Sequence, residues 1–469
     1  MPRKQSRLTL PLALLAGAGG LFAGRAGTSF LARPGPTADD REPADGRHKV
    51  VIVGAGFGGL QAAISLRHRQ DIDLTVMDSQ NHHLFQPLLY QVATAALSPD
   101  DIAAPIRGIL PIGFNARVLM DQVTGVDIAA RHVICGDQRL PYDTLVLATG
   151  SKPSYFGHED WSDAAPGLKT LDDAVELRNR ILEAFEKAAY EADPNERKRL
   201  LTFVLIGGGA TGVEMAGSIA ELAHSMLSRN YDLGGLRAHI VLIEAGPRLL
   251  AGFASDLSDN ATKALASLGV EIQTNTRVTD IKGDRVILEN QTLVAETVIW
   301  TAGTEATPVA EWLDLKPGRG GRVPVDTRLR VQGHPEIHII GDAALALDRD
   351  GKAFPALAPV AKQQGHYVAQ AIMGGLDGWP AQAPFRYRDF GTLATIGRNK
   401  AVAEFGPVHL TGTLAWLTWA GAHIFFLIGF RNRVMVSMQW IFAYATRQRS
   451  NRLIIRGFRG PSSKIPSQA

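Results

Sequence analysis

The chain has 469 residues, of which 45% are hydrophobic and 20% charged, with 48 glycines and a formal net charge of +3. This length allows more than one domain with its own core, the composition is typical of a turn-rich α/β protein, and the small net charge gives no indication of nucleic-acid binding. The single cysteine, Cys135, excludes an intramolecular disulfide, a dithiol centre and a four-cysteine iron–sulfur cluster, so electron chemistry would need a bound organic cofactor.

Residues 1–46 resemble a weak signal or anchor segment. Arg3, Lys4 and Arg7 precede an apolar run over residues 8–24, and a linker rich in proline and aspartate follows. The run contains too much glycine for a good membrane helix. We expect a disordered or loosely membrane-associated extension, and a cleaved export signal is the alternative.

A glycine fingerprint, Gly-Ala-Gly-Phe-Gly-Gly at positions 54–59, follows a strand-like run over residues 49–53. Glycines at such a turn let backbone N–H groups approach a pyrophosphate and let the next helix, expected over residues 61–69, pack close to the strand. The next strand, expected over residues 74–77, ends in Asp78, where a carboxylate accepts hydrogen bonds from an adenosine ribose.

A second fingerprint, Gly-Gly-Gly-Ala-Thr-Gly at positions 207–212, follows the apolar run 201–206 and has its acidic residue at Glu244. One such motif is weak evidence, because ordinary strand–turn–helix corners without a ligand are common. Two copies in the same context predict that the protein holds two dinucleotides at once.

Two similar strand ends, Thr149-Gly150 and Ala302-Gly303, bracket the second fingerprint. The simplest topology inserts one Rossmann-like domain into another, which gives an α/β fold with a first domain over residues 47–166 and 300–402 and an inserted domain over residues 167–299. Asp342 follows a strand expected over residues 337–340 and would meet the ribityl hydroxyls of a flavin. A turn aspartate that caps the next helix is the alternative.

The C-terminal region, residues 403–469, differs from the rest of the chain. From Phe405 onwards it has no Asp or Glu, while tryptophans and arginines interrupt two apolar segments over residues 414–430 and 434–445. Short, arginine-flanked, tryptophan-rich segments are typical of amphipathic helices that lie in a membrane interface and are attracted by anionic lipid. A transmembrane helix and a helix pair buried in a homodimer are the competing interpretations.

Taken together, the chain resembles the type II NADH:quinone oxidoreductases, which are non-proton-pumping, single-subunit flavoproteins with two dinucleotide-binding domains. The resemblance covers almost all of residues 50–455. Its most specific segments are residues 85–93 (FQPLLYQVA), 207–214, 359–365 and 393–398.

The resemblance implies hydride transfer from NADH to FAD, followed by two-electron reduction of a membrane quinone, ubiquinone or menaquinone. It implies FAD on Gly54, Gly56, Gly59, Asp78, Thr149, Gly150 and Asp342, and NADH on Gly207, Gly209, Gly212, Glu214 and Glu244. Gly58, Gln86, Thr211, Gly303, Ala343 and Val360 complete the cofactor-binding set. The protein would be a peripheral membrane protein on the cytoplasmic face of the membrane.

Three residues are the catalytic candidates. We expect Glu214 in the first turn of a helix, where the helix dipole stabilises a carboxylate, reaching toward the nicotinamide; a helix-terminal charge without cofactor contact is the alternative. The resemblance places Gln363 and Gln364, on a helix expected over residues 358–375, near the quinone head group. Their alternative is a pair of exposed polar positions. No His, Cys or Asp spacing indicates a metal site.

Glu244 would repel the 2′-phosphate of NADPH, so we expect a preference for NADH, which the nearby Arg248 would soften. A soluble NAD(P)H-dependent flavin reductase that serves a ferredoxin-like protein is the main alternative, although it has no use for the C-terminal region. A sulfide:quinone oxidoreductase would need more cysteines, and a non-enzymatic redox sensor stays open.

Overall fold

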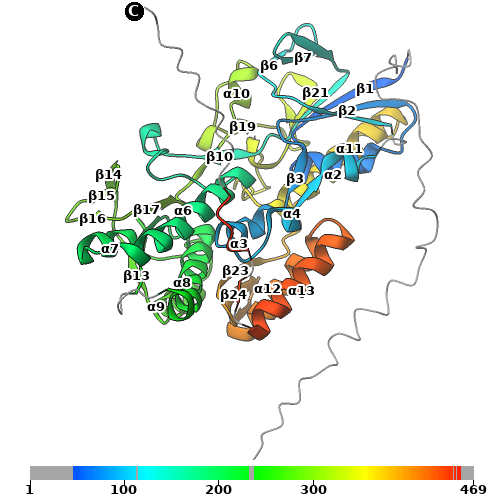
Figure 1. The fold of residues 1–469 in the computed structure, drawn as a ribbon. Helices are drawn as coiled ribbons and strands as arrows, with labels where there is room; N and C mark the ends of the chain where they lie inside the picture. The colour runs from blue at the N-terminus through cyan, green and yellow to red at the C-terminus, as the bar shows by residue number, and fades with distance from the viewer. Residues whose placement is uncertain (1–45, 112–114, 232–236, 447, 450, 456–469) are drawn as a thin grey trace, which may run out of the picture. The chain divides into compact units, whose positions relative to one another are not determined.

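The computed structural model describes residues 46–111, 115–231, 237–446, 448–449 and 451–455 (Figure 1). Apart from Gly46, the extension predicted for residues 1–46 lies outside the described residues. Two parallel sheets, each with helices packed on it, organise the rest.

The first sheet has the strand order β20-β21-β9-β1-β2-β5 and is parallel except for the β20–β21 pair. Its strands are β1 (His48–Val53), β2 (Ile72–Asp78), β5 (Ala116–Met120), β9 (Thr144–Leu147), β20 (Arg330–Val331) and β21 (His334–Ile339). Because β1 lies between β2 and β9, the strand order reverses there, and ligands of such sheets bind at the carboxyl end of this point.

Two helices pack closely together on the first sheet, α2 (Phe57–Leu66) and α11 (Ala358–Leu376). A Cβ atom on Gly365 would lie 2.1 Å from the carbonyl oxygen of Gly58, so this approach requires glycine. The start of α11 is thereby held beside the first glycine loop.

The second sheet is fully parallel, with the order β13-β12-β11-β17. Its strands are β11 (Thr202–Ile206), β12 (His239–Ile243), β13 (Val270–Gln273) and β17 (Thr297–Trp300), and its helices are α6 (Leu171–Tyr190), α7 (Pro194–Leu200), α8 (Ala210–Asn230) and α9 (Ser255–Ala266). An antiparallel sheet of β14 (Val278–Lys282), β15 (Arg285–Leu288) and β16 (Thr292–Val294) follows β13. Like β1, β11 lies at the reversal of strand order.

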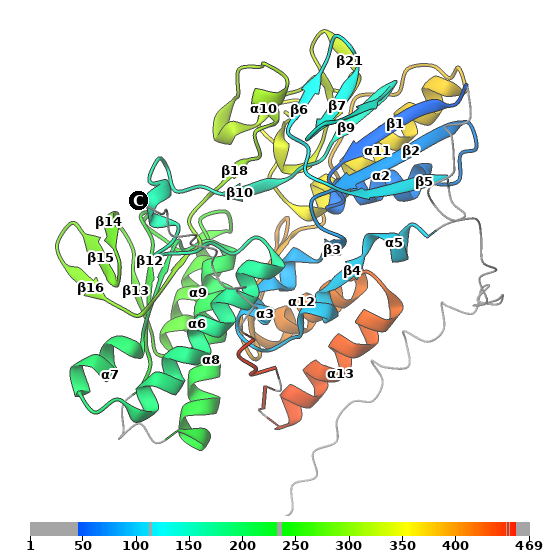
Figure 2. The same cartoon turned by 45° about the horizontal axis from the view of Figure 1, so that its top comes forward.

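The chain passes between the two sheets on β10 (Ser151–Pro153) and returns on β18 (Thr304–Ala306). The two crossings pair antiparallel with each other, as Figure 2 shows. Strands of the first sheet therefore come from both sides of the segment that forms the second.

Smaller elements complete the described part. Between β2 and β9 in the chain lie β3 (His82–Leu84), η1 (Gln86–Leu88), α3 (Leu89–Ala93), α4 (Pro99–Ile102), β4 (Ala103–Pro105), α5 (Ile106–Ile109), β6 (Gly125–Asp127), β7 (His132–Cys135) and β8 (Gln138–Pro141). Later in the chain lie η2 (Glu159–Trp161), α10 (Val309–Trp312), η3 (Arg319–Gly321), β19 (Val323–Pro324), η4 (Gly341–Ala343) and β22 (Ala344–Leu345).

The C-terminal part is an antiparallel sheet followed by two helices. The sheet comprises β23 (Thr392–Gly397), β24 (Lys400–Phe405) and β25 (Val408–Thr411), and the helices are α12 (Gly412–Phe426) and α13 (Phe430–Thr446). A Cβ atom on Gly217 of α8 would lie 1.7 Å from the carbonyl oxygen of Ile396, so β23 packs directly on the backbone of α8. None of the helices in the described part of the chain is long and apolar enough to cross a bilayer.

Several element limits differ from the predicted ones. The helix expected over residues 61–69 is α2, which begins at Phe57 because Gly56 is its N-cap. Arg431 and Arg433 were expected to end an apolar segment, but they lie in the first turn of α13. The loop before α13 is set by Gly429, which has a φ of +87°.

Candidate cofactor and active site

In the first glycine loop, Gly54 and Gly59 lie too close to backbone atoms for a side chain, whereas Gly56 is open to solvent. Gly54 has a φ of +98°, and a Cβ atom there would lie 2.3 Å from the carbonyl oxygen of Ala148 at the end of β9. A Cβ atom on Gly59 would lie 1.8 Å from the carbonyl oxygen of Gly54. One on Gly56 would meet nothing within 4 Å, so the space over this residue fits a pyrophosphate.

The second loop repeats this arrangement. Gly207 has a φ of +115°, and its Cβ atom would lie 2.6 Å from the backbone nitrogen of Ala302 at the end of β17. A Cβ atom on Gly212 would lie 1.8 Å from the carbonyl oxygen of Gly207, whereas Gly209 again faces open space. Both loops therefore fit a dinucleotide in the same manner.

The acidic residues after the second strands hold these loops in place. Asp78 accepts hydrogen bonds from the backbone N–H groups of Ala55, at 2.6 Å, and Gln80, at 2.8 Å. Glu244 accepts from Gly208 and Gly246, both at 2.6 Å. Each carboxylate oxygen keeps a lone pair for a ribose hydroxyl. Burial raises the pKa of Asp78.

Arg248 does not turn its charge toward Glu244. Its guanidinium donates to the carbonyl oxygens of Phe253, at 2.7 Å, and Ala251, at 2.8 Å. These two bonds hold the guanidinium on the backbone of the following loop, so the geometry gives no direct support for the predicted softening of the NADH preference.

Asp342 lies in η4, and its side chain caps no helix, so the capping alternative is wrong. Its Oδ2 accepts a hydrogen bond from the hydroxyl of Ser151 at 2.7 Å. The neighbouring Ala343 is buried. Thr149 bonds to Thr307 through their hydroxyls, and Gly150, with a φ of +74°, faces open space.

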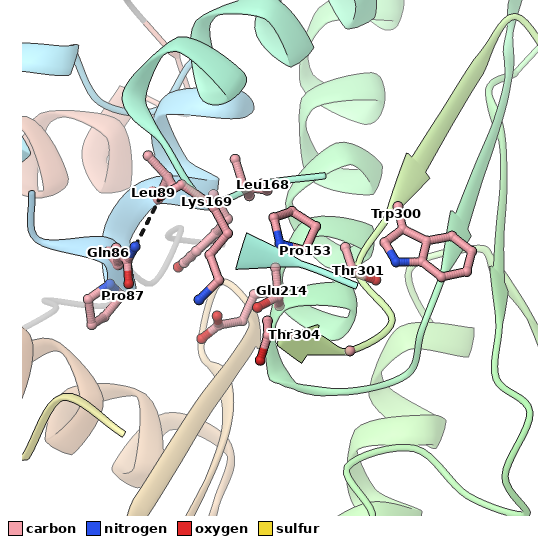
Figure 3. Close-up of a pocket in the computed structure, with 13 residues that line it drawn as sticks. Gln86, Pro87, Leu89, Pro153, Leu168, Lys169, Glu214, Trp300, Thr301 and Thr304 are labelled. Atoms are coloured by element: carbon pink, nitrogen blue, oxygen red, sulfur yellow. Dashed lines mark hydrogen bonds between the residues drawn. The ribbon is translucent and has the colours of Figure 1, made fainter. Parts of the chain in front are cut away.

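A pocket lies among η1, α3, the paired strands β10 and β18, the start of α8 and the end of β17 (Figure 3). It is lined by Gln86, Pro87, Leu89, Tyr90, Pro153, Leu168, Lys169, Thr211, Glu214, Trp300, Thr301, Gly303 and Thr304. Four predicted site residues thus share one pocket: Gln86, Thr211, Glu214 and Gly303. Tyr90 and Lys169 were not predicted. Of these two residues, only Tyr90 could have been found from the sequence, because it belongs to the family-specific segment 85–93.

Glu214 is the fifth residue of α8 and lies outside its first turn, contrary to the prediction. Its carboxyl accepts a hydrogen bond from the backbone N–H of Thr395 on β23 at 3.3 Å. Burial raises the pKa of Glu214 to about 8. Burial thus favours the protonated form of this carboxyl group near neutral pH.

The two glutamines of α11 have different surroundings. Gln364 is 1% exposed, and its Oε1 accepts a hydrogen bond from the N–H of Gly341 at 2.7 Å. The alternative of an exposed polar position is therefore wrong for Gln364. Gln363 is partly exposed and bonds to the backbone N–H and carbonyl of Arg388, both at 2.9 Å. Neither glutamine lines the pocket, and Val360 is buried one turn earlier.

Gln364→Leu should destabilise the turn that carries Asp342. The partly buried N–H of Gly341 would lose its acceptor, at a cost of about 1–3 kcal/mol. We expect a lower melting temperature and faster loss of bound flavin, measured by thermal unfolding and by flavin fluorescence in the filtrate. Gln370→Leu is the matched control, because Gln370 is exposed on the same helix. Equal melting temperatures for the two variants would contradict the prediction.

Polar side chains fasten α13 to the rest of the chain. Trp440 donates to Oε1 of Gln91 at 2.8 Å, and Gln439 donates to Asp101 at 2.9 Å. Gln91 in turn donates to the hydroxyl of Tyr90, which lines the pocket. The C-terminal helices are therefore connected to the pocket by hydrogen bonds.

Two glycine loops, each at the reversal of strand order in its own parallel sheet, are typical of dinucleotide-dependent oxidoreductases. In agreement, the family model described as pyridine nucleotide-disulphide oxidoreductase matches residues 48–365. A second family model, the NDH2 C-terminal domain, matches residues 390–447. With the relatives below, these matches show that the chain belongs to the type II NADH:quinone oxidoreductases, which confirms the predicted family and fold class.

The relatives match over most of their length. Type II NADH:quinone oxidoreductase Ndh of Mycobacterium tuberculosis is 39% identical over 419 residues, which is 86% of this chain and 89% of the relative. NdhA of the same organism is 39% identical over 438 residues, covering 89% and 92%. The solved structure of NDH2 from Plasmodium falciparum in complex with NADH shares the fold, with a TM-score of 0.79 at 23% identity over 87% of this chain and 100% of that one.

Proposed function

We propose that this protein oxidises NADH through bound FAD and delivers two electrons and two protons to a membrane quinone. The observation that carries the proposal is the pocket. Thr211 of the second fingerprint and Glu214, two residues after it, line this pocket together with Gln86 and Tyr90, which precede the second sheet in the chain. The two cofactor rings would meet there. The names of the mycobacterial relatives support NADH and quinone as the substrates.

FAD is our choice for the first loop because three of its residues suit successive parts of a dinucleotide. Gly56 leaves space where a pyrophosphate would lie, Asp78 would accept from an adenosine ribose, and Asp342 would accept from the ribityl chain. The bound FAD would accept the hydride of NADH and pass the electrons on. We also propose the domain limits 47–166, 167–299, 300–402 and 403–469, which the mixed origin of the first sheet supports.

Quinone would approach from the side of the C-terminal helices. Lys362, next to Gln363 at the start of α11, has its Nζ 5.6 Å from the ring centre of Phe426 at the end of α12. The start of α11 thus meets the apolar helices. A head group that enters here from lipid would reach Gln363, whose amide is able to donate or accept a hydrogen bond to a quinone carbonyl.

The decisive experiment is anaerobic addition of NADH, and then of a soluble quinone analogue, to the purified protein while flavin absorbance is recorded. Bleaching by NADH and recovery on addition of quinone would support both half-reactions. Bleaching without recovery would point to a protein acceptor and overturn the quinone proposal. A flavin that NADH does not bleach would refute the assignment of NADH.

An apolar face on α12 and α13 is our proposed membrane contact. Its exposed side chains are Leu414, Leu417, Phe425, Phe426, Phe430, Val434, Met435, Met438, Ile441, Phe442 and Tyr444. Arg431 is exposed at the start of α13, where it would meet anionic headgroups. We assign the membrane side to the cytoplasm, since NADH is available there.

Met438→Glu combined with Ile441→Glu should weaken binding to anionic lipid vesicles at least tenfold in a co-sedimentation assay. Each substitution removes an apolar side chain worth about 1.5–3 kcal/mol when buried. Met120→Glu on β5 is the matched control, because Met120 is 62% exposed and Met438 is 61% exposed. The proposal would be wrong if the double variant bound vesicles like the wild type. If, in addition, the wild type were a dimer and the double variant a monomer, the apolar face would instead contact a second copy of the chain.

A further inference from the structure

Lys169 occupies a position in the pocket that the proposed reaction has not yet used. Its side chain is 20% exposed, and its Nζ donates to the hydroxyl of Ser151 at 2.9 Å. Ser151 in turn donates to Oδ2 of Asp342 at 2.7 Å, and the same carboxylate oxygen is 4.0 Å from Nζ. The ammonium is therefore joined to the residue proposed for the ribityl chain, directly by charge and through one hydroxyl.

The backbone of Lys169 is held on both sides. Its carbonyl oxygen accepts a hydrogen bond from Nε2 of Gln86 at 3.1 Å, and its N–H donates to Asp173 at 2.9 Å. Asp173 also forms the capping box of α6 with Thr170. Figure 3 shows the side chain extending into the pocket, on the side of Glu214 and Thr304. These contacts fix the direction in which the charge points.

Lys169 is the single basic residue among the 13 that line the pocket. The other titratable side chains of this lining are Tyr90, whose pKa burial raises well above its usual value, and Glu214, whose pKa burial raises to about 8. Burial lowers the pKa of Lys169, while Asp342 opposes that shift. The pocket lining thus presents one half-buried cation, and Asp342 is the carboxylate paired with its ammonium group.

The proposed reaction creates a charge that this cation would meet. A hydride leaves NADH with two electrons and one proton, so NADH becomes NAD⁺ and the acceptor gains one negative charge until a further proton arrives. We propose that Lys169, held by Ser151 and Asp342, is the residue that stabilises this negative charge on the bound flavin and so raises its reduction potential. The inference rests on the proposed function, because it requires a flavin in this pocket.

The test is the midpoint potential of the protein-bound flavin, measured by equilibration with a reference dye under anaerobic conditions. In Lys169→Met we expect the reduction equilibrium to become at least tenfold less favourable, which for a two-electron couple is about 30 mV. Lys169→Arg should restore most of the potential because it restores the charge. Lys169→Gln, which keeps a donor for Ser151 but no charge, should behave like Lys169→Met and replaces it if that variant does not fold.

The matched control is Lys152→Met, which makes the same change in net charge one residue after Ser151. Lys152 is 55% exposed and pairs with Glu305 at 3.1 Å, so its loss should leave the potential unchanged. Neutral variants with the potential of the wild type would overturn the inference, as would an equal shift in Lys152→Met. A wild-type protein without bound flavin would instead overturn the proposed function, so the two failures are distinguishable.

Discussion

Replacing Gly212 with alanine will slow the reduction of the bound flavin by NADH roughly 10- to 100-fold and leave the flavin content unchanged. The new Cβ atom would lie 1.8 Å from the carbonyl oxygen of Gly207 and 2.8 Å from the hydroxyl of Thr301. The loop must move away from both, which costs about 1–3 kcal/mol and displaces the N–H groups that would bind a pyrophosphate. Stopped-flow reduction at several NADH concentrations measures the effect.

Gly209→Ala tests whether a pyrophosphate occupies the space over the loop, because it fills that space without disturbing the packing of the loop. Its Cβ atom would meet no protein atom within 4 Å, so the melting temperature should stay that of the wild type while the affinity for NADH falls. Gly252→Ala, which also meets nothing within 4 Å, lies outside both fingerprints and should change neither quantity. If Gly209→Ala binds NADH like the wild type, no pyrophosphate lies over this residue.

The second large expected effect is that the oxidation of NADH depends on pH because of the carboxyl group of Glu214. With its pKa raised to about 8, the carboxyl group is expected to lose its proton progressively as the pH rises through 8. An ionised carboxylate in the pocket would oppose the arrival of a hydride by repulsion. We expect kcat/KM for NADH to fall about tenfold per pH unit above pH 8, and the profile of Glu214→Gln to stay flat. The matched control is Glu176→Gln, an exposed position on α6.

The same shift makes stability depend on pH with a known sign. The folded pKa lies above the usual value of 4.5, so the folded state binds the extra proton and the free energy of unfolding falls as pH rises from about 4.5 to 8. Glu214→Gln should therefore melt at a higher temperature than the wild type at pH 9 and at a similar one near pH 5. The raised pKa would be contradicted if the wild type kept its activity above pH 8 and also kept its stability between about pH 4.5 and 8.

The glycine loops and their acids could be placed from sequence because everything they need is local. Gly54 and Gly207 end a strand, and Asp78 and Glu244 end the next parallel strand, so their geometry follows from one strand–helix–strand unit each. The assignment of these residues to FAD and NADH stays a prediction that the flavin and NADH measurements above will test.

The pocket could not be predicted in the same way, because its lining comes from segments that only the folded chain brings together. Lys169 precedes α6 in a stretch without any motif, and it lies far in sequence from its partner Asp342. Gln363 and Gln364 show a second limit. Neighbours on a helix point about 100° apart, so one is buried under η4 while the other bonds to Arg388, and no sequence feature indicates which is which.

The paired crossings β10 and β18 restrict how the two halves of the molecule move. A single connecting strand would allow one half to swivel about the chain, whereas two strands joined by backbone hydrogen bonds oppose such a rotation. The paired strands also border the pocket, since Pro153 and Thr304 face each other at one end of the pair and both line it. With two paired connections, the lining of the pocket on this side is held by both crossings of the chain and not by one.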